Sequence, residues 1–185
     1  GLQVISISII IVFSYLSSEK VLLGHAKDIM ENIATYTVRE AQSYLKPAQD
    51  AARLTKRLAD SNVVGNQNLD ESESYFYEHL VLHPHFAGIY MGSPNGEFLY
   101  VSRNHQKVAD GFRTKSIILK DGIKTTELKW KDKFQKEFER EYDAHDTYDP
   151  TRRPWYLRAR QKRQTIWTTP YIFFTSKQPG ITTAS

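Results

Sequence analysis

Apolar and polar positions divide the chain into an apolar start, a helical stretch and an alternating second half. Residues 2–16 contain no charged side chain and one glutamine. As a helix, this segment is about 22 Å long, whereas the hydrocarbon core of a bilayer is about 30 Å thick. Because the chain opens on Gly1, we expect a fragment of a longer protein and a truncated transmembrane helix. A signal-peptide core and a buried strand of isoleucines are the alternatives.

Residues 17–60 show the spacing of one long helix. Two apolar stripes repeat at intervals of three and four residues, which predicts a helix of about 40 residues, roughly 60 Å long. Pro47 removes a backbone donor, so we expect a kink or a break near Tyr44. We expect the seam to face a sheet or a second subunit. The stripes are Leu22, Ala26, Ile29, Ile33 and Tyr36, and then Ala34, Val38, Ala41, Leu45, Ala48, Ala52 and Ala59, with Thr55 filling the gap between the last two.

The remaining residues change to the two-residue period of β-strands. A short helix is predicted at 71–82, with Tyr75, Leu80 and Leu82 among its buried candidates. A hairpin joins 86–91 to 97–102 through the turn Gly-Ser-Pro-Asn-Gly. The later expected elements are strands at 116–120, 125–130, 165–176 and 181–184, a surface helix or loop at 131–142, a helix at 150–162 and a turn at 179–180.

Strands that follow one another directly predict an α+β fold, in which helices cover one face of an antiparallel sheet. Hydrophobic residues make up 40% of the chain and charged residues 25%, an ordinary globular balance. The absence of cysteine excludes disulfides and thiolate metal sites. A net charge of +4 permits an anionic partner without requiring one.

The most informative stretch is residues 148–156, which read Tyr-Asp-Pro-Thr-Arg-Arg-Pro-Trp-Tyr. Arg153 offers a planar fork of donors that fits a carboxylate in bidentate fashion. The indole N–H of Trp155 and the hydroxyl of Tyr148 are donors on rigid rings. Tyr156 is a further candidate contact. The stretch therefore predicts a grip on a small carboxylate.

A structural interpretation of the same residues stays open. Asp149 stands before Pro150 and is placed to cap the following helix. In this alternative, Trp155 belongs to the core and Arg153 pairs with Asp149 or Asp146. The stretch would then be a rigid corner that only braces the fold.

Together with two later segments, this stretch resembles the double Cache sensor domain. The later segments are Trp-Thr-Thr-Pro-Tyr at 167–171 and Pro-Gly-Ile-Thr at 179–182. Such domains are extracytoplasmic ligand-binding modules of bacterial chemoreceptors, sensor kinases and nucleotide cyclases. The resemblance implies a long N-terminal helix packed on a PAS-like antiparallel sheet. The expected parts are a truncated transmembrane helix at 1–16, a long spine helix at 17–60 and the membrane-distal PAS-like Cache module at 61–185.

The resemblance is more specific to the amino-acid-binding double Cache domains. Tyr148, Arg153 and Trp155 match the spacing of the residues that hold the ligand carboxylate there. Tyr171 stands where a tyrosine helps to bind the ligand ammonium group. Phe173 stands where an acidic residue would complete that ammonium site. The resemblance thus implies a carboxylate grip and leaves open an amino acid or another carboxylic acid.

Other chemistry is weakly indicated. Residues 152–163 hold six basic side chains and no acidic one, for which we expect a solvated helix face and no nucleic-acid partner. We expect no cofactor and no enzymatic activity, because nucleophile-elbow and phosphate-binding glycine motifs are missing. We expect no metal site, because His83-Pro84 interrupts any helix and no carboxylate completes a ligand set. The histidines and acids weighed as metal ligands are His79, His83, His85, Asp143, His145 and Asp146.

From these observations we expect a sensor in the bacterial cytoplasmic membrane, with this domain on the periplasmic or extracellular side. It would bind a small carboxylate such as an amino or organic acid, form a homodimer in the full receptor, and relay occupancy across the membrane. The alternative function is a ligand-free structural, dimerisation or protein-docking module.

Overall fold

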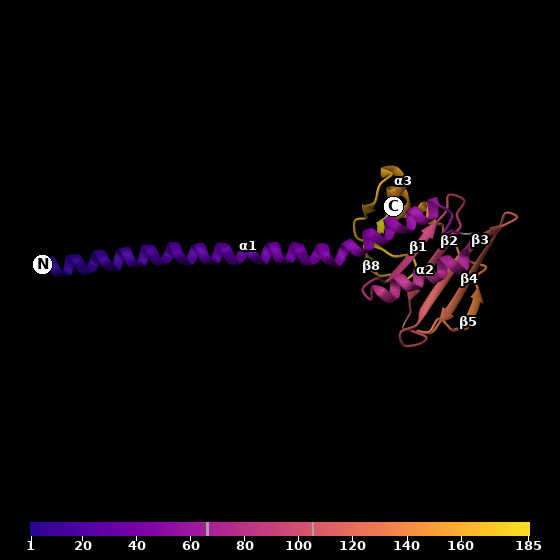
Figure 1. The fold of residues 1–185 in the computed structure, drawn as a ribbon, viewed down its shortest axis with the longest axis horizontal. Coiled ribbons are helices and arrows are strands. Elements are labelled where there is room, and N and C mark those ends of the chain that lie inside the picture. Colours follow the sequence, from indigo (N-terminus) through magenta and orange to yellow (C-terminus); the bar gives the residue numbers. More distant parts are fainter. Residues whose placement is uncertain (66, 105) are drawn as a thin grey trace. The chain divides into compact units, whose positions relative to one another are not determined.

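The computed structural model describes residues 1–65, 67–104 and 106–185. It has an α+β fold, with a long N-terminal helix and a five-stranded antiparallel sheet (Figure 1). The chain divides into two units, Gly1–Lys46 and Pro47–Ser185. The elements are α1 (Leu2–Asp60), α2 (Leu69–Leu82), β1 (Gly88–Gly92), β2 (Phe98–Arg103), β3 (Phe112–Lys120), β4 (Ile123–Lys131), β5 (Glu137–Tyr142), η1 (Pro150–Arg152), α3 (Pro154–Lys162), β6 (Ile166–Trp167), β7 (Tyr171–Ile172), β8 (Pro179–Gly180) and β9 (Thr183–Ala184).

The N-terminal unit is helical throughout residues 2–46. Its apolar side chains are exposed, with Ile9 at 64% and Phe13 at 74% of their full accessibility. The alternative of a buried isoleucine strand is therefore wrong. The helix is long and apolar enough to cross a membrane, and a signal sequence at this end of a chain would have the same properties.

We predicted a kink or a break near Tyr44. α1 continues through Pro47, so the break is wrong. Beyond Pro47 the helix belongs to the larger unit and contacts its core. Ala51 is buried there, and Ala48 and Leu58 pack against the same apolar cluster. The alanines permit close approach because their side chains are small.

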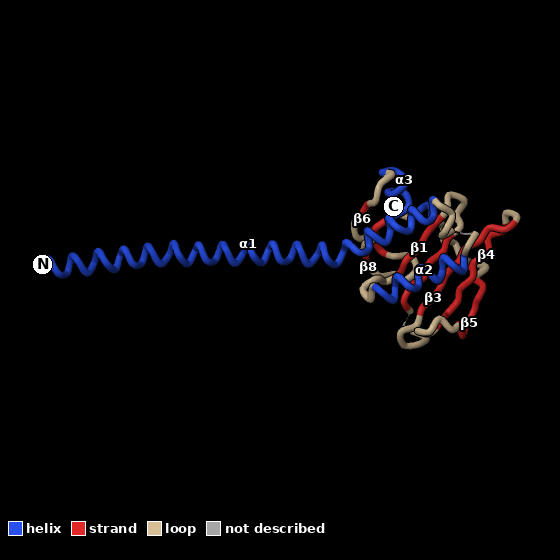
Figure 2. Tube along the Cα trace, viewed as in Figure 1, coloured by secondary structure: helices blue, strands red, loops and turns tan. Residues whose placement is uncertain are grey.

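The sheet has the strand order β1-β2-β3-β4-β5, and every neighbouring pair is antiparallel (Figure 2). The predicted β1–β2 hairpin is confirmed. Its turn holds Gly96 at a φ of 91°, a conformation that glycine adopts without a steric penalty. Tyr90, Tyr100 and Lys115 lie side by side across the first three strands.

One face of the sheet is covered by α2 and the end of α1. Leu99 and Val101 of β2 are each 1% exposed and pack with Phe76 and Leu80 of α2. The predicted burial of Leu80 is confirmed, because its side chain is fully buried. The predicted burial of Leu82 is wrong, because Leu82 is 71% exposed. A helix buries only one stripe, and Leu82 lies two residues beyond the buried position.

A buried carboxylate also ties α2 to this face. Glu73 accepts a hydrogen bond from the Thr114 hydroxyl at 2.7 Å. Its oxygens lie 2.5 Å from the Lys131 amino group and 3.4 Å from that of Lys129. Burial opposes ionisation, but these hydrogen bonds and charges lower the pKa of Glu73 below its ordinary value. The carboxylate is thus held ionised between the helix and strands β3 and β4.

The opposite face is covered by the segment from Tyr148 to α3 and by the C-terminal strands. Phe98 and Ile117 on this face pack with Tyr148 and Trp155. Adjacent residues of a strand point to opposite faces, so Phe98 and Leu99 belong to two separate cores. Helices therefore cover both faces of the sheet, and the expectation of a single covered face is wrong.

β5 is a strand where we predicted a surface helix or loop. Its sequence, Glu-Phe-Glu-Arg-Glu-Tyr, has no buried residue, so it lacks the apolar alternation that marks a half-buried strand. Pairing with β4 holds it at the sheet edge. Arg140 adds an ion pair to Glu127 of β4 at 2.9 Å.

The C-terminal segment is more broken than predicted. The expected single strand at 165–176 is two short strands, β6 and β7, on either side of Pro170. Proline lacks the N–H that a continuous ladder needs. β6 pairs with β9, and β7 pairs with β8 at Pro179–Gly180, where a turn was expected.

Candidate functional site

Residues 148–156 lie on the sheet face that α3 covers. Tyr148 and Trp155 are each 7% exposed. Asp149 caps η1, because its carboxylate accepts the Thr151 N–H at 2.9 Å, as the sequence predicted. We call the group formed by Tyr148, Arg153, Trp155, Tyr156, Tyr171 and Phe174 the arginine–aromatic cluster.

Arg153 lies between two aromatic rings. Its guanidinium carbon is 4.7 Å from the centre of the Tyr148 ring and 4.4 Å from that of Phe174. Its Nε is buried and has no hydrogen-bond partner. Aromatic faces attract the cation but do not supply the acceptors that its N–H groups need. A planar anion is the group that would satisfy this fork.

No carboxylate of the described residues lies within ion-pair distance of Arg153. Asp149 binds the neighbouring Arg152, at 3.3 Å. Asp146 binds Lys115, at 2.8 Å. The structural alternative paired Arg153 with one of these two acids, and that pairing is wrong. The guanidinium therefore remains without an internal counterion.

Trp155 and Tyr148 form the floor of the cluster. The Trp155 ring centre is 4.8 Å from that of Tyr90 and 5.5 Å from that of Tyr156. Burial raises the pKa of Tyr148 well above its ordinary value, against a hydrogen bond from Trp155 and the charge of Arg153. The phenol stays neutral at physiological pH and keeps its proton to donate. The part of the structural alternative that assigned Trp155 to the core is confirmed.

Tyr171 joins the cluster through hydroxyl groups. Its phenol lies 2.9 Å from Thr182 Oγ1, and the phenol of Tyr90 lies 2.6 Å from the same oxygen. Burial raises the pKa of Tyr90 well above its ordinary value. Phe173, in the position of the expected acid, lies edge-on to Tyr171 with ring centres 5.0 Å apart. Its ring contacts Gly180, where a Cβ would collide with it.

The structure thus brings together all five predicted ligand residues, Tyr148, Arg153, Trp155, Tyr156 and Tyr171. They come from the loop before η1, from the start of α3 and from β7. Their ligand-binding role stays a prediction. What the structure adds is that one partly buried cation and several aromatic rings lie together beside one apolar cluster.

Two basic residues of β3 were missed. The Lys115 amino group lies 4.9 Å from the centre of the Tyr148 ring, and Arg113 has a buried Nε without a hydrogen-bond partner. The predicted strand began at Ser116, whereas β3 begins at Phe112. The alternation in Phe-Arg-Thr-Lys-Ser-Ile was the available signal, since it places Arg113, Lys115 and Ile117 on one face.

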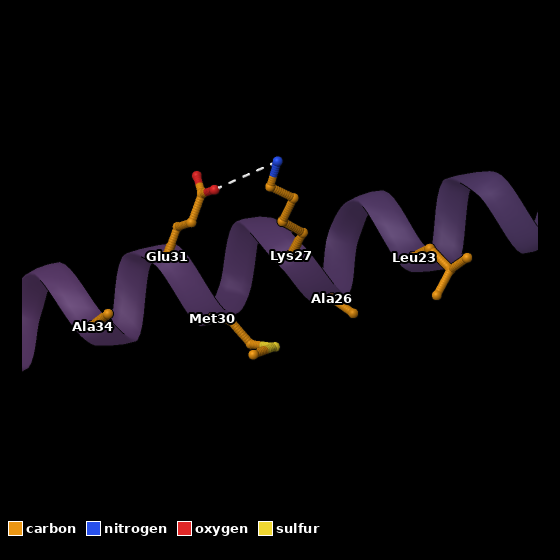
Figure 3. Close-up of a pocket in the computed structure, with 6 residues that line it drawn as sticks. All are labelled: Leu23, Ala26, Lys27, Met30, Glu31 and Ala34. Carbon is orange, nitrogen blue, oxygen red and sulfur yellow. Dashed lines mark ion pairs between the residues drawn. The ribbon is translucent and has the colours of Figure 1, made fainter.

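The N-terminal unit carries a separate, open groove along α1 (Figure 3). Lys27 and Glu31 form an ion pair at 3.8 Å on one side of it. All of its lining residues belong to one helix, so it cannot enclose a small molecule. They are Leu23, Ala26, Lys27, Met30, Glu31 and Ala34.

Three closely spaced histidines, His79, His83 and His85, were candidate metal ligands in the sequence. Within residues 1–65, 67–104 and 106–185, no group of three His, Asp or Glu side chains could hold a metal ion. The rings of His79 and His83 stack at 6.1 Å, and His83 lies edge-on to His85 at 5.9 Å. These histidines form an aromatic row at the end of α2.

A scan against protein-family models, a search of curated proteins and a search of solved structures each found no match for this chain. The likeness to double Cache domains therefore rests on the sequence motifs.

Proposed function

We propose that this chain is the ligand-binding part of a membrane-anchored sensor and that its ligand is a small carboxylate. The observation that carries the proposal is Arg153, a partly buried guanidinium with an unsatisfied Nε and no carboxylate partner among the described residues. Taking a charged group out of water without supplying a partner is unfavourable. A protein tolerates such a cost most readily where a ligand supplies the missing charge.

The cluster supplies the other contacts that such a ligand needs. A carboxylate on Arg153 would accept two parallel N–H bonds. The Tyr148 hydroxyl is the nearby donor of the motif, and the indole N–H of Trp155 hydrogen-bonds to that hydroxyl. Phe174 and Tyr171 offer aromatic surface to the rest of the ligand. Binding would therefore combine one strong ionic contact with apolar contacts to the ligand skeleton.

The fold is compatible with a PAS-like module of a double Cache sensor. A five-stranded antiparallel sheet carries the arginine–aromatic cluster on one face and the end of the long α1 helix on the other. Ligand binding on one face would shift the position of the sheet. Because Leu99 of the sheet and Ala51 of α1 belong to one apolar cluster, this shift would also move the helix on the other face. In this proposal α1 anchors the protein in a bacterial cytoplasmic membrane, with residues 61–185 outside the cytoplasm.

A melting-point screen tests the proposal. The full chain, in detergent, is mixed with single amino acids and organic acids, and its unfolding temperature is followed by tryptophan fluorescence. A ligand at 100 times its dissociation constant should stabilise the protein by about 2.7 kcal/mol. Arg153→Gln should abolish the shift because it removes the charge and the donor fork.

Arg160→Gln is the matched control, since Arg160 is an exposed residue of α3, the helix that Arg153 precedes. It should leave the shift unchanged. If a carboxylate shifts the melting point of Arg153→Gln as much as that of the wild type, Arg153 is not the carboxylate anchor.

A second candidate function is a ligand-free dimerisation or docking module. The open groove of Leu23, Ala26, Met30 and Ala34 favours it, because exposed small and apolar residues suit a second helix. The same screen separates the two candidates. A protein that dimerises by light scattering, and whose melting point no carboxylate changes, supports the docking module.

A further inference from the structure

The strand register places Arg113 on the same sheet face as the arginine–aromatic cluster. Arg113 of β3 lies opposite Ser102 of β2 and Trp130 of β4. The next position on this face of β3 is Lys115, whose amino group contacts the Tyr148 ring. Successive same-face positions are about 6.6 Å apart along a strand. Arg113 is therefore one such step from a residue that touches the cluster.

Arg113 is unpaired in the same way as Arg153. Its Nε is buried without a hydrogen-bond partner, and it forms no ion pair with any acid in the described part of the chain. Burial lowers the pKa of Arg113 below its ordinary value, and only the Tyr100 phenol acts against this. Four side-chain atoms of the described residues are buried without a partner, and two of them are these guanidinium nitrogens.

The charge around the cluster is unbalanced. Lys115 and Lys124 share one carboxylate, that of Asp146, at 2.8 and 3.6 Å. Lys177 adds a further cation, with its amino group 4.5 Å from the centre of the Phe174 ring. Once Asp146 is counted against these lysines, both arginines still lack a negative partner. One carboxylate on the ligand would balance only one of the two.

We infer that Arg113 is a second anion-binding residue of the site and that the ligand carries two anionic groups. One anionic group of the ligand binds Arg153, and the other binds Arg113. Tyr100 and Lys115 occupy the position on this face of the sheet between the two anion-binding residues. A short dicarboxylate or an acidic amino acid has this chemistry. This inference rests on the proposed function, because it extends the ligand that Arg153 holds.

Titration calorimetry on the full chain in detergent tests the inference. The dianionic probes are succinate, malate, aspartate and glutamate, and the singly charged probes are butyrate and alanine. The wild type should bind at least one dianionic probe tenfold or more tightly than its singly charged counterpart. Arg113→Gln should weaken the dianionic probe by about 10- to 100-fold, since the loss of one charged hydrogen-bond partner has this size. Binding of butyrate or alanine should change by less than about twofold.

Two further variants complete the design. Arg153→Gln should weaken both classes of probe, and Arg160→Gln should weaken neither. Arg113→Lys keeps the charge but loses the fork, so it should fold and recover part of the dianion affinity. Far-ultraviolet circular dichroism confirms that each variant is folded.

The outcomes separate the two proposals. If Arg153→Gln abolishes carboxylate binding but Arg113→Gln weakens both classes equally, or neither, the second anchor is wrong and the proposed function stands. The second anchor is also wrong if dianionic probes bind no more tightly than singly charged ones. If no carboxylate binds the wild type, both proposals are wrong.

Discussion

Asp149 forms its ion pair with Arg152, at 3.3 Å, and not with the adjacent Arg153. The same carboxylate caps η1 by accepting the Thr151 N–H and the Thr151 hydroxyl, at 2.9 and 2.6 Å. Its acceptor sites are thus used locally. Asp149, the acid nearest to Arg153 in sequence, therefore stabilises the turn. The guanidinium of Arg153 contacts the rings of Tyr148 and Phe174 instead.

The cap predicts a variant that separates stability from binding. Asp149→Ala should lower the free energy of unfolding by about 1 kcal/mol, the usual cost of a lost cap. Carboxylate affinity should change little because Asp149 does not pair with Arg153. Urea unfolding and calorimetry measure the two quantities. A loss of affinity larger than about tenfold would show that the cap positions the anchor.

Gly92 controls how closely the motif approaches the sheet. A Cβ at this position would lie 2.8 Å from the Pro150 Cβ and 3.1 Å from the Trp155 Cη2. Gly92→Ala should therefore lower the free energy of unfolding by about 1–3 kcal/mol, the usual cost of overpacking. Gly65→Ala is the control, since a Cβ there has no heavy atom within 4 Å. Equal urea midpoints for the two variants would mean that the contact relaxes freely.

Asp146 predicts a pH dependence of stability. Its side chain is 5% exposed and binds Lys115. Burial opposes its ionisation, but the hydrogen bonds from Lys115 and the Tyr148 N–H lower its pKa below the ordinary value of 3.8. A carboxyl whose pKa is lower in the folded state stabilises the fold above its unfolded pKa. That contribution is lost as the pH falls through the folded value.

The measurement compares the wild type with Asp146→Asn in urea at several values between about pH 6 and about pH 3. The wild type should be more stable by a constant amount above about pH 5, and the difference should shrink as the pH falls below about 4. A difference that does not depend on pH would mean that the charge of Asp146 contributes nothing.

Replacing Arg113 should raise the free energy of unfolding while removing the second anion-binding group that we propose. Without a ligand, Arg113→Met removes a half-buried charge whose Nε has no hydrogen-bond partner, and it keeps much of the side-chain volume. It should raise the free energy of unfolding by about 1–3 kcal/mol, whereas exposed Arg160→Met should change it by less than about 0.5 kcal/mol. A fall in stability would show that Arg113 has a structural partner in solution.

The sequence predicted the elements that local residues determine and missed those that contacts between distant residues determine. The β1–β2 hairpin was predictable because its turn, with Gly96 in the left-handed region, is local. β5 was not, because its charged side chains are held by strand pairing and by the Arg140–Glu127 ion pair, which joins residues 13 positions apart. Pro47 marked a helix end by local rules, yet the helix continues through it.

The residues of the candidate site also divide into those that a local motif predicts and those that only the fold brings to the site. Arg153 and Trp155 could be predicted because they belong to one short motif with a recognisable spacing. Arg113 could not, because its importance depends on which acids are already paired and on which strand lies beside β3. Sequence patterns do not show that Asp146 is paired with Lys115 or that Asp149 is paired with Arg152.

The alternation of β2 has a consequence for how this protein can evolve. Phe98 and Leu99 point into different cores, so the positions that face the arginine–aromatic cluster are interleaved with those that hold α2. If the proposed function is right, substitutions at every second residue can change ligand preference while the helix contacts persist. An insertion or deletion of one residue would exchange the two sets. New specificities should therefore arise in this strand by replacement, with its length conserved.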